Sequence, residues 1–259
     1  MTKRTAALAF CLAALFAASC AKPRPVPEMP SPPVEDLAQA MIERAQPITA
    51  NGKLRSGGLS LGSADCQIVA DPRLGVRIDA FTPFMTAAGS LVIRPERALY
   101  LNAMEGLLVR GRPEEVLGRV FGLPADPSPL AWVLTGGLPP AESWHMVSTG
   151  VDDPRGAVML EGTDATGRRL RAAVEGPERR LTRLTVSGND KQSNELGDIA
   201  VIECDNHMEG SLPVPRKIVF RAGERRSLVL RLDEVTIGKG PSLPDLDIPE
   251  RPGMNVMDF

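Results

Sequence analysis

The chain has 259 residues, of which 43% are hydrophobic but only 4% aromatic, and its formal net charge at pH 7 is −2. This acidic balance argues against a nucleic-acid-binding protein and against a general attraction to anionic lipid, because both need a surplus of basic residues. The many aliphatic residues predict aliphatic interior surfaces, and the length suits one large all-β domain.

Residues 1–19 have the pattern of a bacterial signal peptide. A basic start is followed by an apolar run that is too short to span a membrane as a mature helix. The run ends in Ala17-Ala18-Ser19-Cys20, which resembles the lipobox of bacterial lipoproteins, and Ala21 rather than Asp follows, which indicates sorting to the outer membrane. We therefore predict a lipoprotein signal peptide over 1–19 and lipid modification of Cys20. The alternative is an ordinary secretory signal that leaves a free thiol.

The segment after the signal peptide is rich in proline. Residues 20–33 contain six prolines, which predict an extended tether between the membrane and the folded domain. Residues 34–45 then place apolar side chains at helical spacing, and Pro47 ends that helix.

From residue 50 onward, apolar and polar residues mostly alternate, as they do in half-buried strands. Clear examples are 74–80, 99–103, 170–174 and 228–232. We count about eleven such segments, joined by turns too short for crossover helices, so we expect antiparallel neighbours. Turns are expected at residues 152–156, 187–190 and 205–207, and the proline-rich segment 238–259 is expected to lie along the surface.

Residues 113–136 are the clearly helical part of the chain body. Pro113 suits the first position of a helix, and Gly122 can adopt the left-handed conformation that ends it. A second helix is expected to begin at Asp126 as N-cap and to end at Gly136. Each helix has one apolar face that must be buried on the sheet. The sequence therefore predicts a curved sheet with a helical cover.

Motifs for catalysis or metal binding are incomplete. Residues 58–62, Gly-Leu-Ser-Leu-Gly, match a nucleophile elbow, but a strand pattern rather than a helix follows them. His145 and His207 are the two histidines, and neither belongs to a complete metal-ligand pattern. We therefore expect no enzymatic activity, no metal and no cofactor.

Two cysteines remain in the expected mature domain. Cys66 and Cys204 form an even pair in what would be an oxidising compartment, so we predict a disulfide between them. Two buried free thiols on separate strands are the alternative.

Three stretches resemble a known family. Residues 77–84 (RIDAFTPF) resemble a strand that ends in a short loop, 114–124 (EEVLGRVFGLP) a first lid helix with its Gly-x-Pro, and 130–139 (LAWVLTGGLP) a second lid helix. The family is the LolA/LolB superfamily, and the resemblance is closest to its LolB branch of outer-membrane lipoprotein receptors. It implies an open antiparallel β-barrel with a helical lid and a hydrophobic cavity for the acyl chains of a lipoprotein in transit. The resemblance covers most of residues 50–237, and in the loop Phe84-Met85 replaces the family's Leu-Gly.

The resemblance also implies positions for the site. The half-barrel domain would span 34–237 with its lid at about 113–136, and the protruding apolar residue that enters a membrane would be Phe84, in the loop Pro83–Met85. The alternative is that Phe84 folds under the lid as core. One apolar interior is expected from Val76, Ile78, Leu91, Ile93, Leu99, Leu101, Val116, Val120, Leu130 and Leu134.

These observations favour a monomeric, lipid-anchored protein on the periplasmic face of the outer membrane of a Gram-negative bacterium. The resemblance implies that it receives the acyl chains of lipoproteins from a periplasmic LolA-like carrier. Two alternatives stay open: a related carrier of another amphiphile such as a glycolipid, and a structural lipoprotein of the envelope.

Overall fold

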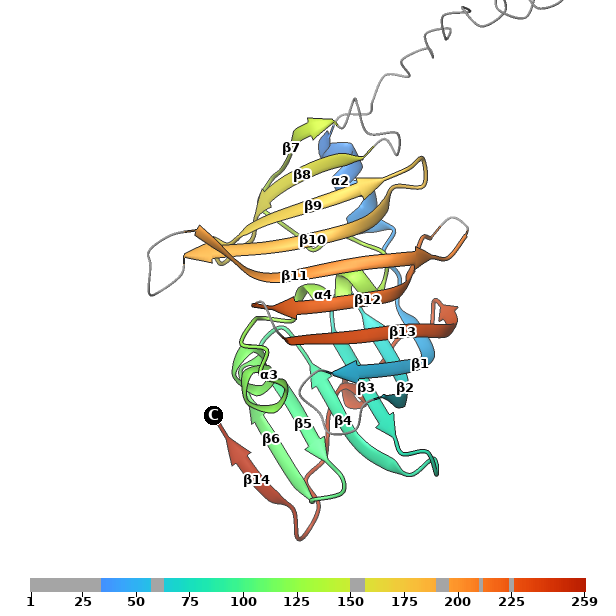
Figure 1. Cartoon of the computed structure of the whole chain (residues 1–259), viewed down its shortest axis with the longest axis vertical. Coiled ribbons are helices and arrows are strands. Elements are labelled where there is room, and N and C mark those ends of the chain that lie inside the picture. Colours follow the sequence, from blue (N-terminus) through green and yellow to red (C-terminus); the bar gives the residue numbers. More distant parts are fainter. Residues whose placement is uncertain (1–33, 57–62, 150–156, 190–195, 210–211, 224–225) are drawn as a thin grey trace, which may run out of the picture. The chain divides into compact units, whose positions relative to one another are not determined.

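The structure is a computed structural model that describes residues 34–56, 63–149, 157–189, 196–209, 212–223 and 226–259. These residues form one sheet of 14 strands with few helices, which confirms the expected mainly β, open architecture (Figure 1). Every neighbouring pair of strands is antiparallel except β14 with β6. In sheet order the strands are β14 (Asn255–Asp258), β6 (Leu107–Gly111), β5 (Ala98–Asn102), β4 (Ala87–Ile93), β3 (Gly75–Phe81), β2 (Ala64–Asp71), β1 (Ile48–Ser56), β13 (Arg226–Ile237), β12 (Pro215–Ala222), β11 (Leu196–His207), β10 (Arg180–Asn189), β9 (Arg169–Glu175), β8 (Val158–Thr163) and β7 (Trp144–Thr149).

The alternation in the sequence gives the sheet its two faces. Along β1, Ile48, Ala50, Gly52, Leu54 and Ser56 are buried, and the residues between them are more exposed. The pairing of β1 with β13 shifts between Asn51 and Gly52. A Cβ atom at Gly52 would lie 1.9 Å from the carbonyl oxygen of Arg231, so this bulge requires glycine.

In the described part of the chain, three α-helices cover parts of the inner face, which we define as the face that carries the main core. They are α2 (Val34–Glu43), α3 (Pro113–Phe121) and α4 (Pro129–Leu134). α2 contacts β7, α3 contacts β5 and β6, and α4 contacts β2, β3 and β12. Within the described residues, no helix is both long enough and apolar enough to cross a membrane.

The ends of α3 follow the sequence, but the start of α4 does not. Pro113 occupies the first turn of α3, and Gly122 ends it with a left-handed φ of 64°. α4 begins at Pro129 rather than directly after Asp126. The Asp126 carboxylate accepts a 2.8 Å hydrogen bond from the backbone N–H of Ser128, and this local turn delays the helix.

The C-terminal segment joins the sheet. Residues Leu243–Leu246 form a short 3-10 helix, η2, which contacts β3. Leu246 and Ile248 are buried against Val92 and Leu108, in a small cluster separate from the main core. β14 then pairs in parallel with β6, as Figure 1 shows. The segment expected only to lie along the surface thus also extends the sheet.

Two expected turns are parts of strands. β10 continues through 187–189, because a bulge between Val186 and Ser187 absorbs the irregularity. β11 continues to His207, and Asn206 has a positive φ of 52° within it. The Nε2 atom of His207 lies 2.8 Å from the carbonyl oxygen of Leu181. Burial lowers the pKa of this imidazole, which is consistent with a structural role.

Candidate functional site

Most of the residues expected to line one apolar interior lie on the inner face. Val76, Ile78, Leu91, Ile93, Leu130 and Leu134 belong to the main core. Val116 belongs to a smaller cluster with Ala98 and Val109, and Val120 is partly buried between that cluster and the main core.

Leu99 and Leu101 do not face this interior. Leu99 is buried against Leu246 in the cluster under the C-terminal segment, and Leu101 packs against the same cluster. Their neighbours Ala98 and Tyr100 point to the inner face instead. Successive residues of a strand point to opposite faces. In β5 the inward-facing residues are therefore Ala98 and Tyr100, and the expectation for Leu99 and Leu101 is wrong by one position.

The interior beneath α3 is closely packed. The pocket found there has a volume of only about 40 Å³ and is lined by Ile78 and Leu91 together with Tyr100 and Phe121. The rings of Tyr100 and Phe121 meet edge to face, with centroids 5.6 Å apart. The expected cavity is therefore nearly filled by side chains at this place.

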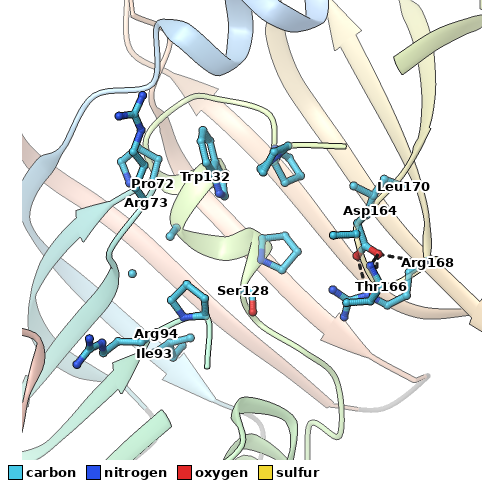
Figure 2. Close-up of a pocket in the computed structure, with 17 residues that line it drawn as sticks. Pro72, Arg73, Ile93, Arg94, Ser128, Trp132, Asp164, Thr166, Arg168 and Leu170 are labelled. Carbon is cyan, nitrogen blue, oxygen red and sulfur yellow. Dashed lines mark hydrogen bonds and ion pairs between the residues drawn. The ribbon is translucent and has the colours of Figure 1, made fainter. Parts of the chain in front are cut away.

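A larger pocket lies beside α4, and we call it the α4 pocket. Its volume is about 360 Å³ and its walls are mainly apolar, with contributions from the ends of β2 and β4, from α4 and from the turn between β8 and β9. Figure 2 shows Trp132 and Ser128 between two walls, with Arg73 and Arg94 on one side and Asp164, Thr166 and Arg168 on the other. Of the residues expected to line a cavity, only Ile93 lines this pocket.

The wall formed by the turn between β8 and β9 carries paired charges. Arg168 contacts Asp126 through Nη1 and Asp164 through Nε, each at 2.7 Å. Burial opposes ionisation of Asp164, but hydrogen bonds from Thr166 and Arg168 outweigh that effect and lower the pKa of the carboxyl group. This wall is therefore held by an internal ion-pair network.

The loop between β3 and β4 presents two apolar side chains to solvent. Phe84 is 88% exposed and Met85 is 70% exposed, so Phe84 is not core. The N–H of Met85 donates to the carbonyl oxygen of Thr82 at 2.9 Å, and the hydroxyls of Thr82 and Thr86 lie 2.6 Å apart. The tip that contains Pro83 is thus a tight turn, and its apolar side chains are displayed by an ordered backbone.

Cys66 and Cys204 are both buried and both free, so the predicted disulfide is wrong and the alternative of two free thiols holds. Cys66 lies on β2 and Cys204 on β11, with β1, β13 and β12 between them. Four interstrand spacings correspond to about 19 Å along the sheet, and a disulfide needs Cα atoms within about 7 Å. Burial raises the pKa of the Cys66 thiol to about 12.

The remaining expected sites add no residue to the candidate site. Cys20, the motif at 58–62 and the turn at 152–156 lie outside the described residues. His145 is the second residue of β7, follows Trp144 and is exposed. In the described part of the chain, no group of three or more His, Cys, Asp or Glu side chains is arranged to hold a metal ion.

Neither a known protein family nor a curated protein matches the sequence, but solved structures share its fold. A putative outer membrane lipoprotein-sorting protein domain from Vibrio parahaemolyticus gives a TM-score of 0.56 at 10% identity, over 82% of this chain and 95% of that chain. A LolA superfamily protein from Nitrosomonas europaea gives 0.52 at 11% identity, over 82% and 94%. A DUF1329 family protein from Desulfovibrio piger gives 0.59 at 14% identity, over 84% and 98%. The chain thus has a LolA-like fold, and likeness at these identities extends to the fold alone.

Proposed function

We propose that this protein binds an acyl chain of a lipid or lipoprotein in the α4 pocket. The observation that carries the proposal is the mainly apolar pocket of about 360 Å³ beside α4, which falls within the range of about 300–1,000 Å³ typical of ligand pockets. Each acyl CH₂ gains about 0.8 kcal/mol on leaving water, so a long chain gains about 10 kcal/mol before the costs of binding. The fold shared with a protein described as lipoprotein-sorting supports the same class of ligand.

In the finer form of the proposal, the protein is a receptor for acylated lipoproteins at the periplasmic face of the outer membrane. Cys20 would carry the lipid anchor, a LolA-like carrier would deliver the cargo, and the loop at Pro83–Met85 would enter the bilayer. The exposure of Phe84 on a tight turn supports this last role, because a large apolar side chain at a loop tip needs an apolar partner.

The first test measures binding of a fluorescent monoglyceride, which has an acyl chain and no charge, to the full chain. Ala165 is exposed, lies in the turn between β8 and β9 and lines the α4 pocket. Ala165→Trp should fill the pocket and remove most of the binding. Ala103→Trp is the matched control, because Ala103 is also an exposed alanine in a hairpin turn but is not part of this pocket. Absence of binding to the unmodified chain, or equal binding by Ala165→Trp, would reject the proposal.

The second test concerns delivery. Phe84→Glu should change the free energy of unfolding by less than about 0.5 kcal/mol, because the side chain is in solvent, and should abolish transfer of an acylated lipoprotein to lipid vesicles. Val147→Glu is the control: Val147 is 53% exposed and lies on β7, at the other end of the sheet. Normal transfer by the Phe84 variant would remove the membrane role from this loop.

A further inference from the structure

The α4 pocket adjoins a second hollow of different chemistry. This hollow has a volume of about 500 Å³ and lies between the turn after β2, the turn after β4 and Leu243 of the C-terminal segment. Three arginines, Arg73, Arg94 and Arg97, contribute to its lining, and we call it the arginine hollow. Arg73, Arg94 and Pro95 line both spaces. The two spaces are therefore adjacent and meet at these three residues.

Two of these arginines form no ion pair with the residues that the structure describes. Arg97 pairs with Asp247 at 3.3 Å. Within the described residues, the guanidinium groups of Arg73 and Arg94 make neither an ion pair nor a hydrogen bond. The lining also contains one acid, Glu96, so the unpaired arginines leave the hollow with a net positive charge.

This charge differs from that of the rest of the site. Arg168, on the opposite wall of the α4 pocket, pairs with Asp164, as Figure 2 shows, and it also pairs with Asp126. The chain as a whole is acidic, with a net charge of −2, so the hollow is not part of a generally basic surface. An apolar pocket and an adjoining cationic hollow together match an amphiphile with an apolar chain and an anionic head.

We propose that the ligand of the α4 pocket is an anionic phospholipid, with its acyl chain beside Trp132 and its phosphate group in the arginine hollow. This inference rests on the proposed function, because it requires an acyl chain in the α4 pocket. Guanidinium groups bind phosphate oxygens through paired, charge-assisted hydrogen bonds, and they do so more specifically than ammonium groups. The inference adds the class of headgroup, which the apolar pocket alone does not define.

The test is a displacement assay on the full chain with bound fluorescent monoglyceride. Two competitors share the palmitoyl chain: lysophosphatidylglycerol, which carries a negative phosphate, and monopalmitoylglycerol, which has no phosphate. Both are used below their micelle-forming concentrations. We expect the phosphate-bearing lipid to bind about tenfold more tightly, and high salt to reduce that preference.

In Arg73→Gln/Arg94→Gln, the ratio of the two affinities should fall to about one. Arg55→Gln/Arg251→Gln is the matched control, because it removes the same charge at two exposed arginines outside both spaces and should keep the preference. The single variants Arg73→Gln and Arg94→Gln should each lose part of the preference, and they decide the matter if the double variant does not fold.

Equal affinity for the two lipids in the unmodified chain would overturn the inference, as would a preference that survives in the double variant. Binding of inorganic phosphate alone as tightly as the lysolipid would overturn it too, by making the hollow a site for free anions. If the monoglyceride probe itself does not bind, the proposed function fails and this inference fails with it. A bound probe without headgroup preference rejects this inference only.

Discussion

The helices α3 and α4 follow each other in the chain, but they contact different parts of the sheet. α3 contacts β5 and β6, which form the hairpin directly before it. α4 contacts β2 and β3 on one side and β12 on the other, and β1 and β13 lie between these strands in the sheet. α3 therefore covers a local hairpin, whereas α4 connects two regions that are distant in sequence.

The difference extends to the space beneath and beside each helix. The pocket next to α3 is about 40 Å³, and the pocket next to α4 is about 360 Å³. Changes in α4 should therefore affect both stability and binding, and changes in α3 mainly stability.

The largest effect is expected from truncating a buried leucine in each helix. Leu117 of α3 and Leu134 of α4 are both fully buried in the main core. Leu117→Ala and Leu134→Ala should each lower the free energy of unfolding by about 2–5 kcal/mol, measured by urea denaturation. Only Leu134→Ala should also weaken monoglyceride binding, because the cavity it creates lets α4 shift against β12. An equal loss of affinity in both variants would contradict the distinction between the helices.

A smaller effect is expected at the glycine that follows each helix. Gly122 after α3 and Gly136 after α4 have left-handed φ values of 64° and 74°. Replacement by alanine should cost about 1–2 kcal/mol for the backbone conformation alone. A Cβ at Gly136 would also lie 3.2 Å from the carbonyl oxygen of Pro213, so Gly136→Ala should be the more destabilising variant in urea denaturation. Equal losses would mean that α4 can move away from the Pro213 segment.

The same contrast explains what could be predicted from the sequence. Local rules were sufficient for α3, because Pro113 and Gly122 act within their own turn, and for the exposure of Phe84 on a short hairpin. Strand alternation gave the sheet but not the parity of β5, where both Leu99 and Tyr100 have apolar neighbours.

Features that depend on contacts between distant parts of the chain could not be predicted from local sequence patterns. The start of α4 depends on Asp126, whose carboxylate also pairs with Arg168 from the turn between β8 and β9. The α4 pocket combines residues from five separate segments, and no local pattern indicates that they meet. The disulfide prediction is wrong for the same reason. An even number of cysteines does not show that Cys66 and Cys204 lie four strand spacings apart in the sheet.

The smallest effect is expected from carboxylates that hold the two helix regions in place. Near α4, Asp164 is hydrogen-bonded by Thr166 and Arg168, and its side chain is only 13% exposed. At the start of α3, Glu115 pairs with Arg112 and its side chain is 31% exposed. The side-chain hydrogen bond from Arg112 lowers the pKa of Glu115, and hydrogen bonds lower that of Asp164 against the opposing effect of burial.

A lowered pKa in the folded state fixes the sign of the pH dependence. The unfolded chain takes up a proton more readily, so the contribution to stability is present above the unfolded pKa of about 4 and is lost as the pH falls further. Asp164→Asn should therefore flatten the fall in unfolding free energy between about pH 5 and pH 3 by about 1 kcal/mol or less, after allowance for solvent screening. Glu115→Gln is the matched control at α3, and its smaller effect should vanish in high salt, because exposed pairs are screened more strongly than enclosed ones. The opposite outcome is that the two variants reduce the loss of unfolding free energy at low pH equally in high salt. In that case the Asp164 ion pair is screened by salt as strongly as the Glu115 pair, and the contrast between the two helices does not include their ion pairs.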